Sequence, residues 1–143
     1  MRYFMPSLVF LLLMPTVAMS ASGDRAGHAH KNGHGQVEVS SFPAIPSLSL
    51  EVSRDAVAGW NIHLVTKNFR FTPEHVNENP IADEGHAHLY VDGKKIARMY
   101  GAWFHLGNLS LGPHTIRVTL NANNHAELVL HGKPIAVTKE IVQ

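Results

Sequence analysis

Residues 84–100 read EGHAHLYVDGKKIARMY, and this stretch decides the fold class of the chain. Apolar and polar side chains alternate on both sides of Asp92 and Gly93, which is the period of a half-buried strand. An Asp-Gly pair supplies the two positive φ angles that a two-residue type I′ turn requires, so the stretch predicts a β-hairpin. Counting outward from the turn predicts the facing pairs Val91–Lys94, Leu89–Ile96, His88–Ala97, Ala87–Arg98 and His86–Met99.

Short alternating segments of the same kind lie on both sides of the hairpin. They are separated by Gly, Pro, Asn and Asp, and almost none keeps a helical period for about ten residues. This pattern predicts an all-β fold, an antiparallel Greek-key-type β-sandwich of immunoglobulin-like or cupredoxin-like architecture with about seven or eight strands. The apolar positions of three such strands are Leu48, Leu50, Val52, Trp60, Ile62, Leu64, Ile116, Val118 and Leu120.

Residues 1–20 have the features of a secretory signal. A charge at Arg2 is followed by an apolar run and then by the small residues Ala18, Ser20 and Ala21. The apolar run is shorter than the roughly 20 residues that span a bilayer, which favours a cleavable signal peptide over a membrane anchor. We therefore expect cleavage after Ala18, Ser20 or Ala21, and a mature protein that is periplasmic or secreted and has no membrane span.

A polar segment, residues 21–36, precedes the part that is predicted to fold as the sandwich, residues 37–143. The polar segment holds no apolar residue larger than Ala, so it cannot bury enough surface to offset the entropy lost on ordering. We expect a flexible tail. Its His28, His30 and His34 either capture a metal ion loosely or serve only solubility, and the sequence leaves both open.

Composition narrows the classes of function. The chain has 143 residues, 11 His, no Cys and a formal net charge of +1. Without Cys it has neither a disulfide nor a thiolate metal site, and without Lys/Arg clusters it lacks the usual electrostatic footprint for nucleic acid. Neither Gly-x-Ser-x-Gly nor His-Glu-x-x-His occurs, so we expect a protein that is not an enzyme.

The predicted hairpin gathers metal-binding side chains on the face that the core does not need. His86 and His88 are two residues apart on a strand, so both point to the same side, and Met99 is predicted directly across from His86. Imidazole together with thioether suits copper, in particular Cu(I), better than zinc. The plain alternative is a pair of exposed polar histidines and a Met that fills a gap in the core.

Two more histidines are candidates for the same site. His105 follows the turn at Gly101 and is predicted to close the site as a further imidazole. His125 lies in the corner NANNHAEL at 121–128, and its placement depends on which ends of the sandwich are neighbours. The histidines expected to occupy ordinary strand, loop or turn positions are His63, His75, His114 and His131.

The hairpin stretch, together with LNANNH at 120–125, resembles small exported bacterial β-sandwich proteins that carry a His-rich hairpin. More distantly it is similar to periplasmic copper-resistance and cupredoxin-like proteins. The resemblance implies a sandwich and a copper preference, but no electron-transfer site, because blue-copper centres need a Cys thiolate. His-x-His also resembles copper-zinc superoxide dismutases, yet their structural disulfide cannot form here and the spacings after His88 do not match.

Two functions of different classes follow from these features. The first is an exported, non-enzymatic protein that binds copper through the histidine hairpin. The second is an immunoglobulin-like periplasmic interaction or assembly module without metal, whose exposed Tyr90, Tyr100 and Trp103 bind a protein or glycan partner. Thermal stabilisation by metal separates the two, because only the first binds an ion in its native state.

Overall fold

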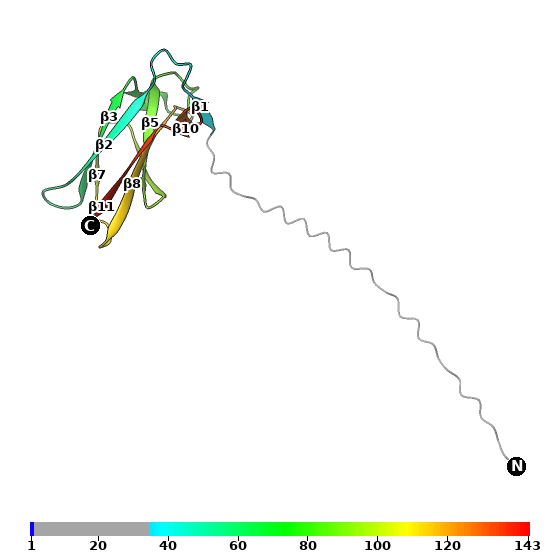
Figure 1. Cartoon of the computed structure of the whole chain (residues 1–143), viewed down its shortest axis with the longest axis vertical. Helices are drawn as coiled ribbons and strands as arrows, with labels where there is room; N and C mark the ends of the chain where they lie inside the picture. The colour runs from blue at the N-terminus through cyan, green and yellow to red at the C-terminus, as the bar shows by residue number, and fades with distance from the viewer. Residues whose placement is uncertain (2–34) are drawn as a thin grey trace. The chain divides into compact units, whose positions relative to one another are not determined.

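The structure, a computed structural model, describes Met1 and residues 35–143, and strands make up most of that range (Figure 1). Apart from Met1, the predicted signal peptide at 1–20 lies outside the described residues, and so do the histidines of the predicted tail. The predicted sandwich at 37–143 lies entirely within them. The architecture below therefore concerns this part of the chain.

The smaller of two sheets has three antiparallel strands in the order β2-β3-β7. Its side chains alternate as the sequence predicts: Leu50 and Ile62 are buried, whereas Glu51 is exposed. One face of this sheet therefore contributes to the core. Its strands are β2 (Ser47–Arg54), β3 (Trp60–Lys67) and β7 (Trp103–Leu106).

The larger sheet has eight strands, in the order β1-β9-β8-β5-β4, with β6, β10 and β11 attached to β5, β9 and β8. Its long strands pair antiparallel, and β8 lies between β5 and β11. The short pairs β1–β9 and β4–β5 are parallel. Its strands are β1 (Gln36–Glu38), β4 (Arg70–Phe71), β5 (Glu84–Val91), β6 (Lys94–Met99), β8 (Pro113–Asn121), β9 (Glu127–Leu130), β10 (Lys133–Pro134) and β11 (Ala136–Val142).

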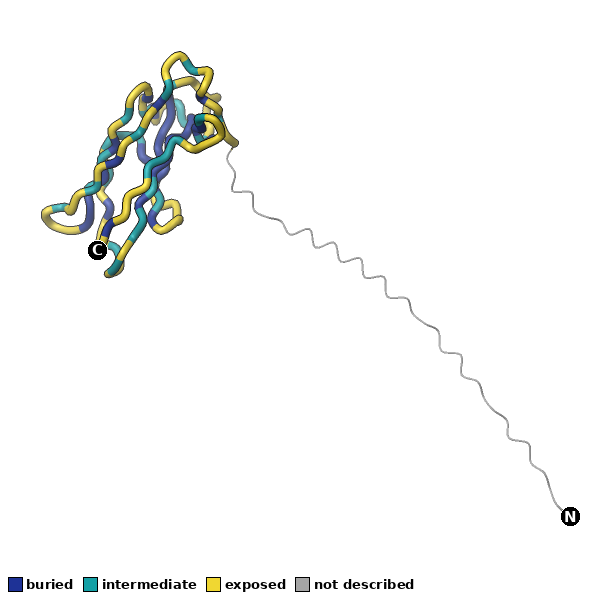
Figure 2. Tube along the Cα trace, viewed as in Figure 1, coloured by how far each residue is buried: buried dark blue, intermediate teal, exposed yellow. Residues whose placement is uncertain are grey.

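The two sheets face each other across one hydrophobic core, so the predicted β-sandwich is confirmed (Figures 1 and 2). Leu64 of the smaller sheet and Leu89 and Val118 of the larger sheet all belong to this core. The expected seven or eight strands are too few, because the described residues form eleven. The excess comes from β1, β4 and β10, whose two or three residues are too short to show a sequence period.

The turn of the β5–β6 hairpin has the predicted conformation. Asp92 and Gly93 have φ angles of 50° and 78°, as a type I′ turn requires, and Val91 pairs with Lys94. Tyr90 faces Lys95, which also fits the predicted register. From Leu89 onward the predicted register is wrong, because the pairing skips Ile96 and the strand carries a β-bulge there. The facing pairs there are Leu89–Ala97, His88–Arg98 and Ala87–Met99.

A single turn of 3₁₀-helix, η1 (Pro73–His75), is the helical element among the described residues. It precedes the loop that leads into β5, and its His75 contacts Glu84 at the start of that strand. In the part of the chain that the structure describes, no helix has the length and apolarity needed to cross a membrane.

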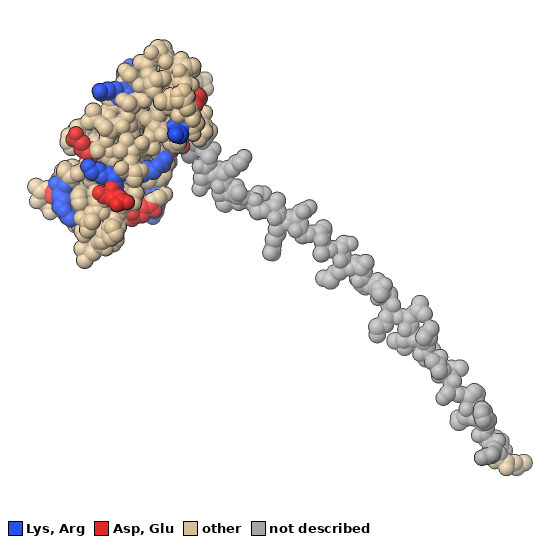
Figure 3. Space-filling model, in the orientation of Figure 1, with Lys and Arg blue, Asp and Glu red and all other residues tan. Residues whose placement is uncertain are grey.

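Charged side chains of both signs lie interspersed on the face drawn in Figure 3. Ion pairs also form within the larger sheet: Arg117 lies 3.4 Å from Glu127, and Arg70 lies 2.6 Å from Glu84. The pairing ties neighbouring strands of the larger sheet to one another.

Candidate metal centre

Strand β5 directs two imidazoles away from the space between the sheets. Ala87 and Leu89 point into the core, so His86 and His88, which alternate with them, point to the outer face of the larger sheet. That face is nevertheless covered here, since His86 is 0% and His88 is 1% exposed. The two imidazoles are therefore held in an enclosed setting on a strand that is paired along both edges.

Gly85 allows strand β8 to approach β5 closely at the histidine end. A Cβ atom at this position would overlap the carbonyl oxygen of Asn121, the residue that pairs with His86. A glycine immediately before the His-x-His motif thus brings the end of β8, and the corner after it, against the two imidazoles.

The corner between β8 and β9 supplies a third imidazole. The His125 N–H donates to the Ala122 carbonyl at 2.9 Å, and the side-chain amide of Asn121 donates to the His125 carbonyl at 3.2 Å. These bonds hold His125 at a φ of 69°, a conformation that is uncommon for a residue with a Cβ. The tight corner turns its ring towards β5.

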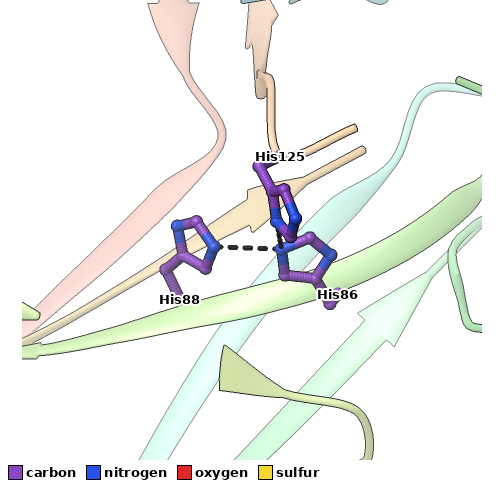
Figure 4. A group of neighbouring side chains, drawn as sticks. All are labelled: His86, His88 and His125. Carbon is purple, nitrogen blue, oxygen red and sulfur yellow. Dashed lines mark hydrogen bonds between the residues drawn. The ribbon is translucent and has the colours of Figure 1, made fainter. Parts of the chain in front are cut away.

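Three ring nitrogens converge at this point (Figure 4). The Nε2 atom of His86 lies 2.9 Å from Nε2 of His88 and 3.1 Å from Nδ1 of His125. One nitrogen from each ring lies within 4.8 Å of the others, and these three residues are the group of this kind found in the described part of the chain. The predicted involvement of His86, His88 and His125 in one cluster is thus seen in the structure.

The convergence suits a cation better than a proton. A neutral ring nitrogen carries either one N–H or one lone pair, so Nε2 of His86 cannot make a full hydrogen bond with both neighbours. Three lone pairs directed at one point are what a metal ion with imidazole ligands requires. With metal–nitrogen bonds of about 2.0–2.1 Å, tetrahedral ligand nitrogens are about 3.3 Å apart. The His86–His88 and His86–His125 nitrogens, at 2.9 and 3.1 Å, therefore need to separate by only a few tenths of an ångström.

Two further side chains contact the outer nitrogens of these rings. The Oδ1 atom of Asn77 lies 2.7 Å from Nε2 of His125, and the Tyr90 hydroxyl lies 3.5 Å from Nδ1 of His88. The ring of Tyr100 lies near His86, with centroids 5.4 Å apart. Each outer contact leaves the opposite nitrogen of the ring facing the cluster.

A carboxylate lies on the same face of β5 but is engaged elsewhere. Glu84 accepts from Arg70 at 2.6 Å and contacts Nδ1 of His75 at 2.7 Å. The hydrogen bond with His75 lowers the pKa of Glu84, and the same bond raises the pKa of His75. The ion pair fixes η1 against the start of β5, beside the cluster.

Met99 does not lie across from His86, and that prediction is wrong. The bulge at Ile96 adds one residue to β6, so Met99 pairs with Ala87 and points into the core. A one-residue shift moves every later side chain of a strand to the opposite face. Met99 is 3% exposed and packs in the hydrophobic core, while Ile96, which the predicted register placed opposite Leu89, is 44% exposed.

The other histidines that the structure describes are not part of the cluster. His105 is exposed on β7 of the smaller sheet, where it pairs with Asn61. His63 stacks on Trp103 with ring centroids 3.9 Å apart, and His114 lies in β8 rather than in a loop. Tyr90 and Tyr100 are on the side of the larger sheet, so they do not form one binding face with Trp103.

Asn77 is the contact that the sequence did not indicate. It lies in a polar loop without a period, and its φ of 68° follows from the tertiary structure. Its one sequence signal is chemical, because Asn tolerates the left-handed region better than most residues.

Comparison with known proteins identifies no relative of this chain. No family model, curated protein or solved structure matches the chain.

Proposed function

We propose that this is an exported, non-enzymatic protein that binds copper through His86, His88 and His125. The observation that carries the proposal is the convergence of three ring nitrogens, two of them on residues that are almost fully buried. Buried imidazoles that face one another across about 3 Å repel if they are protonated, whereas one shared cation attracts all three.

The donor set favours a borderline metal. Imidazole nitrogen suits zinc, copper, nickel and iron, and the group contains no carboxylate that would select a hard ion such as magnesium or calcium. Among divalent first-row ions copper binds nitrogen donors most tightly. With Met99 in the core, the case for copper rests on the imidazoles and no longer on a thioether.

Charge favours the reduced ion. Three neutral imidazoles bring no negative charge to the site, and the cost of burying an ion grows with its charge. Cu(I) introduces one positive charge where Zn(II) introduces two, and Cu(I) accepts low coordination numbers. We therefore expect Cu(I) to be the preferred ion.

Export is supported by the amino terminus, whose charge, apolar run and small residues are those of a signal peptide. The chain enters the fold beside the cluster: Gly35 accepts a hydrogen bond from Glu127, two residues after His125. The histidines of the tail, His28, His30 and His34, precede that point in the sequence and supply additional imidazoles for capture.

The proposal is tested by replacing the ligand that can be removed with least damage. His125→Gly suits the φ of 69° and keeps the backbone hydrogen bonds of the corner. Cu(I) affinity, measured by competition with a chelator, should fall by more than about 10-fold, the least that loss of a supporting contact costs. His105→Ala, an exposed histidine outside the cluster, should leave the affinity unchanged. Equal affinities for the wild type and His125→Gly would overturn the proposal.

A further inference from the structure

The loop between η1 and β5 reaches the cluster through one residue, Asn77. Its backbone N–H donates to the carbonyl oxygen of Asn123 at 2.8 Å, which docks the loop on the β8–β9 corner. Its side-chain oxygen lies 2.7 Å from Nε2 of His125. The β8–β9 corner and the loop are thus joined by two short contacts, a backbone one to Asn123 and a side-chain one to His125.

The side-chain contact determines which nitrogen of His125 carries the proton. An amide oxygen only accepts hydrogen bonds, so Nε2 of His125 must be the N–H donor. In a neutral imidazole the other nitrogen, Nδ1, then carries the lone pair. That nitrogen is the one that lies 3.1 Å from Nε2 of His86.

We propose that Asn77 is a positioning residue of the metal site, which sets the tautomer and ring orientation of His125 so that Nδ1 faces the ion. The inference rests on the function proposed above. A metal-binding histidine ordinarily donates its other ring N–H to an oxygen, and that oxygen fixes the ring and makes the ligand nitrogen more basic. Asn77 supplies the oxygen here.

Of the three ligands His125 has the greatest need of such a partner. His86 and His88 project from a strand that is paired on both edges and are almost fully buried. His125 is half-buried, lies in a corner and has a positive φ. Its ring is held least by its own strand neighbours, so a hydrogen bond at its outer nitrogen has the largest effect on where Nδ1 points.

Two substitutions at Asn77 distinguish the effect of its side-chain oxygen from the effect of its backbone hydrogen bond. Asn77→Gly removes the oxygen while it accepts the φ of 68° and keeps the N–H bonded to Asn123. Asn77→Asp restores an oxygen acceptor in a residue that also tolerates the left-handed region. The matched control is Asn68→Gly, since Asn68 is an exposed Asn with a φ of 53° that bonds Ile45 away from the cluster.

The first measurement is Cu(I) affinity by competition with a chelator. Asn77→Gly should weaken it by about 10- to 100-fold, the usual cost of losing a second-sphere partner. Asn77→Asp should restore it, and Asn68→Gly should bind as the wild type does. Unchanged affinity in Asn77→Gly, or no rescue by Asp, would overturn the inference.

The second measurement needs no metal. Ring ¹⁵N chemical shifts of His125 in the metal-free protein distinguish the two tautomers. The wild type should show the Nε2–H form, and Asn77→Gly should show a mixture. A wild-type protein that binds no ion would overturn the proposed function, while the shifts would still decide whether Asn77 sets the tautomer. A dominant Nδ1–H form in the wild type would overturn the inference even if copper binds.

Discussion

Gly85 has no side chain, and that allows the two parts of the cluster to meet. A Cβ at position 85 would overlap the carbonyl oxygen of Asn121 and lie 3.1 Å from the Cα of Ala122. His86 comes next on β5, and His125 comes four residues after Asn121. A side chain at position 85 would therefore push the corner away from the strand that holds the other two imidazoles.

Gly85→Ala should lower the free energy of unfolding by about 1–3 kcal/mol, the usual cost of forcing a methyl group into a packed site. It should also weaken Cu(I) binding, because His125 moves away from His86. Urea denaturation and chelator competition measure the two effects. Gly101→Ala is the matched control, since a Cβ there meets no atom within 4 Å. Equal behaviour of the two variants would show that the close approach at Gly85 does not matter.

Strand alternation made part of the cluster readable from the sequence. His86 and His88 point the same way because a strand has a period of two, and this needs no tertiary information. The prediction for Met99 was wrong because no feature of the sequence marks the bulge at Ile96. Ile is apolar, and its exposed position is set by the bend of the hairpin. Whether His125 joins them depends on how the end of β8 meets β5, which the local pattern does not contain.

At the scale of elements, the hairpin turn is anchored to the start of β8. Both nitrogens of the His114 ring face acceptors: Nδ1 lies 2.6 Å from Asp92, and Nε2 lies 2.8 Å from the carbonyl of Ser110. The hydrogen bond with Asp92 is the main reason that the pKa of His114 is raised. The N–H of Thr115 and then His114 lower the pKa of Asp92. The ring thus clamps two segments together, and both contacts favour its protonated form.

This clamp predicts a pH dependence of stability. Because the pKa of His114 is raised in the folded protein, this residue stabilises the fold fully at pH values below 6.5, the pKa of an unperturbed His. This contribution is lost as the pH rises through the raised pKa. Because the pKa of Asp92 is lowered in the folded protein, this residue stabilises the fold at pH values above 3.8, the pKa of an unperturbed Asp. This contribution is lost as the pH falls through the lowered pKa. The difference in unfolding free energy between the wild type and His114→Gln should therefore be greatest between these values and shrink towards higher pH.

Urea denaturation of the metal-free protein across pH measures this difference. The same substitution made in an Asp92→Asn background supplies the control, because Asn keeps the positive φ of the turn and removes the charge. In that background the difference should lose most of its pH dependence. A difference that grows above neutral pH would show that His114 is neutral in the folded protein.

Besides turning Met99 into the core, the bulge in β6 affects the edge of the larger sheet. Strand β6 pairs with β5 on one side only, and it carries Lys94, Lys95 and Arg98 beside the bulge at Ile96. Charges and bulges on an edge strand oppose pairing with another chain. The bulge that directs Met99 away from the histidines thus also protects the open edge from pairing with another chain.

In the molecule as a whole, the three clustered histidines come from distant parts of the chain. His86 and His88 come from β5, while His125 comes from the corner that leads into β9. These segments meet only when β5 and β8 are paired in the native register. An ion held by all three therefore binds the folded chain and has no equivalent site in the unfolded one.

Copper should accordingly stabilise the entire domain and not only the corner. At a free Cu(I) concentration of about 100 times Kd, linkage predicts a gain of about 2.7 kcal/mol, and this corresponds to a rise in Tm of roughly 10 °C for a domain of this size. Differential scanning calorimetry under reducing, oxygen-free conditions measures the shift. His125→Gly, with an affinity more than about 10-fold weaker, should lose at least about half of the shift at the same Cu(I) concentration, and His105→Ala should keep it. A shift of the same size in His125→Gly would show that His125 does not bind the ion, because stabilisation by linkage depends on the affinity alone.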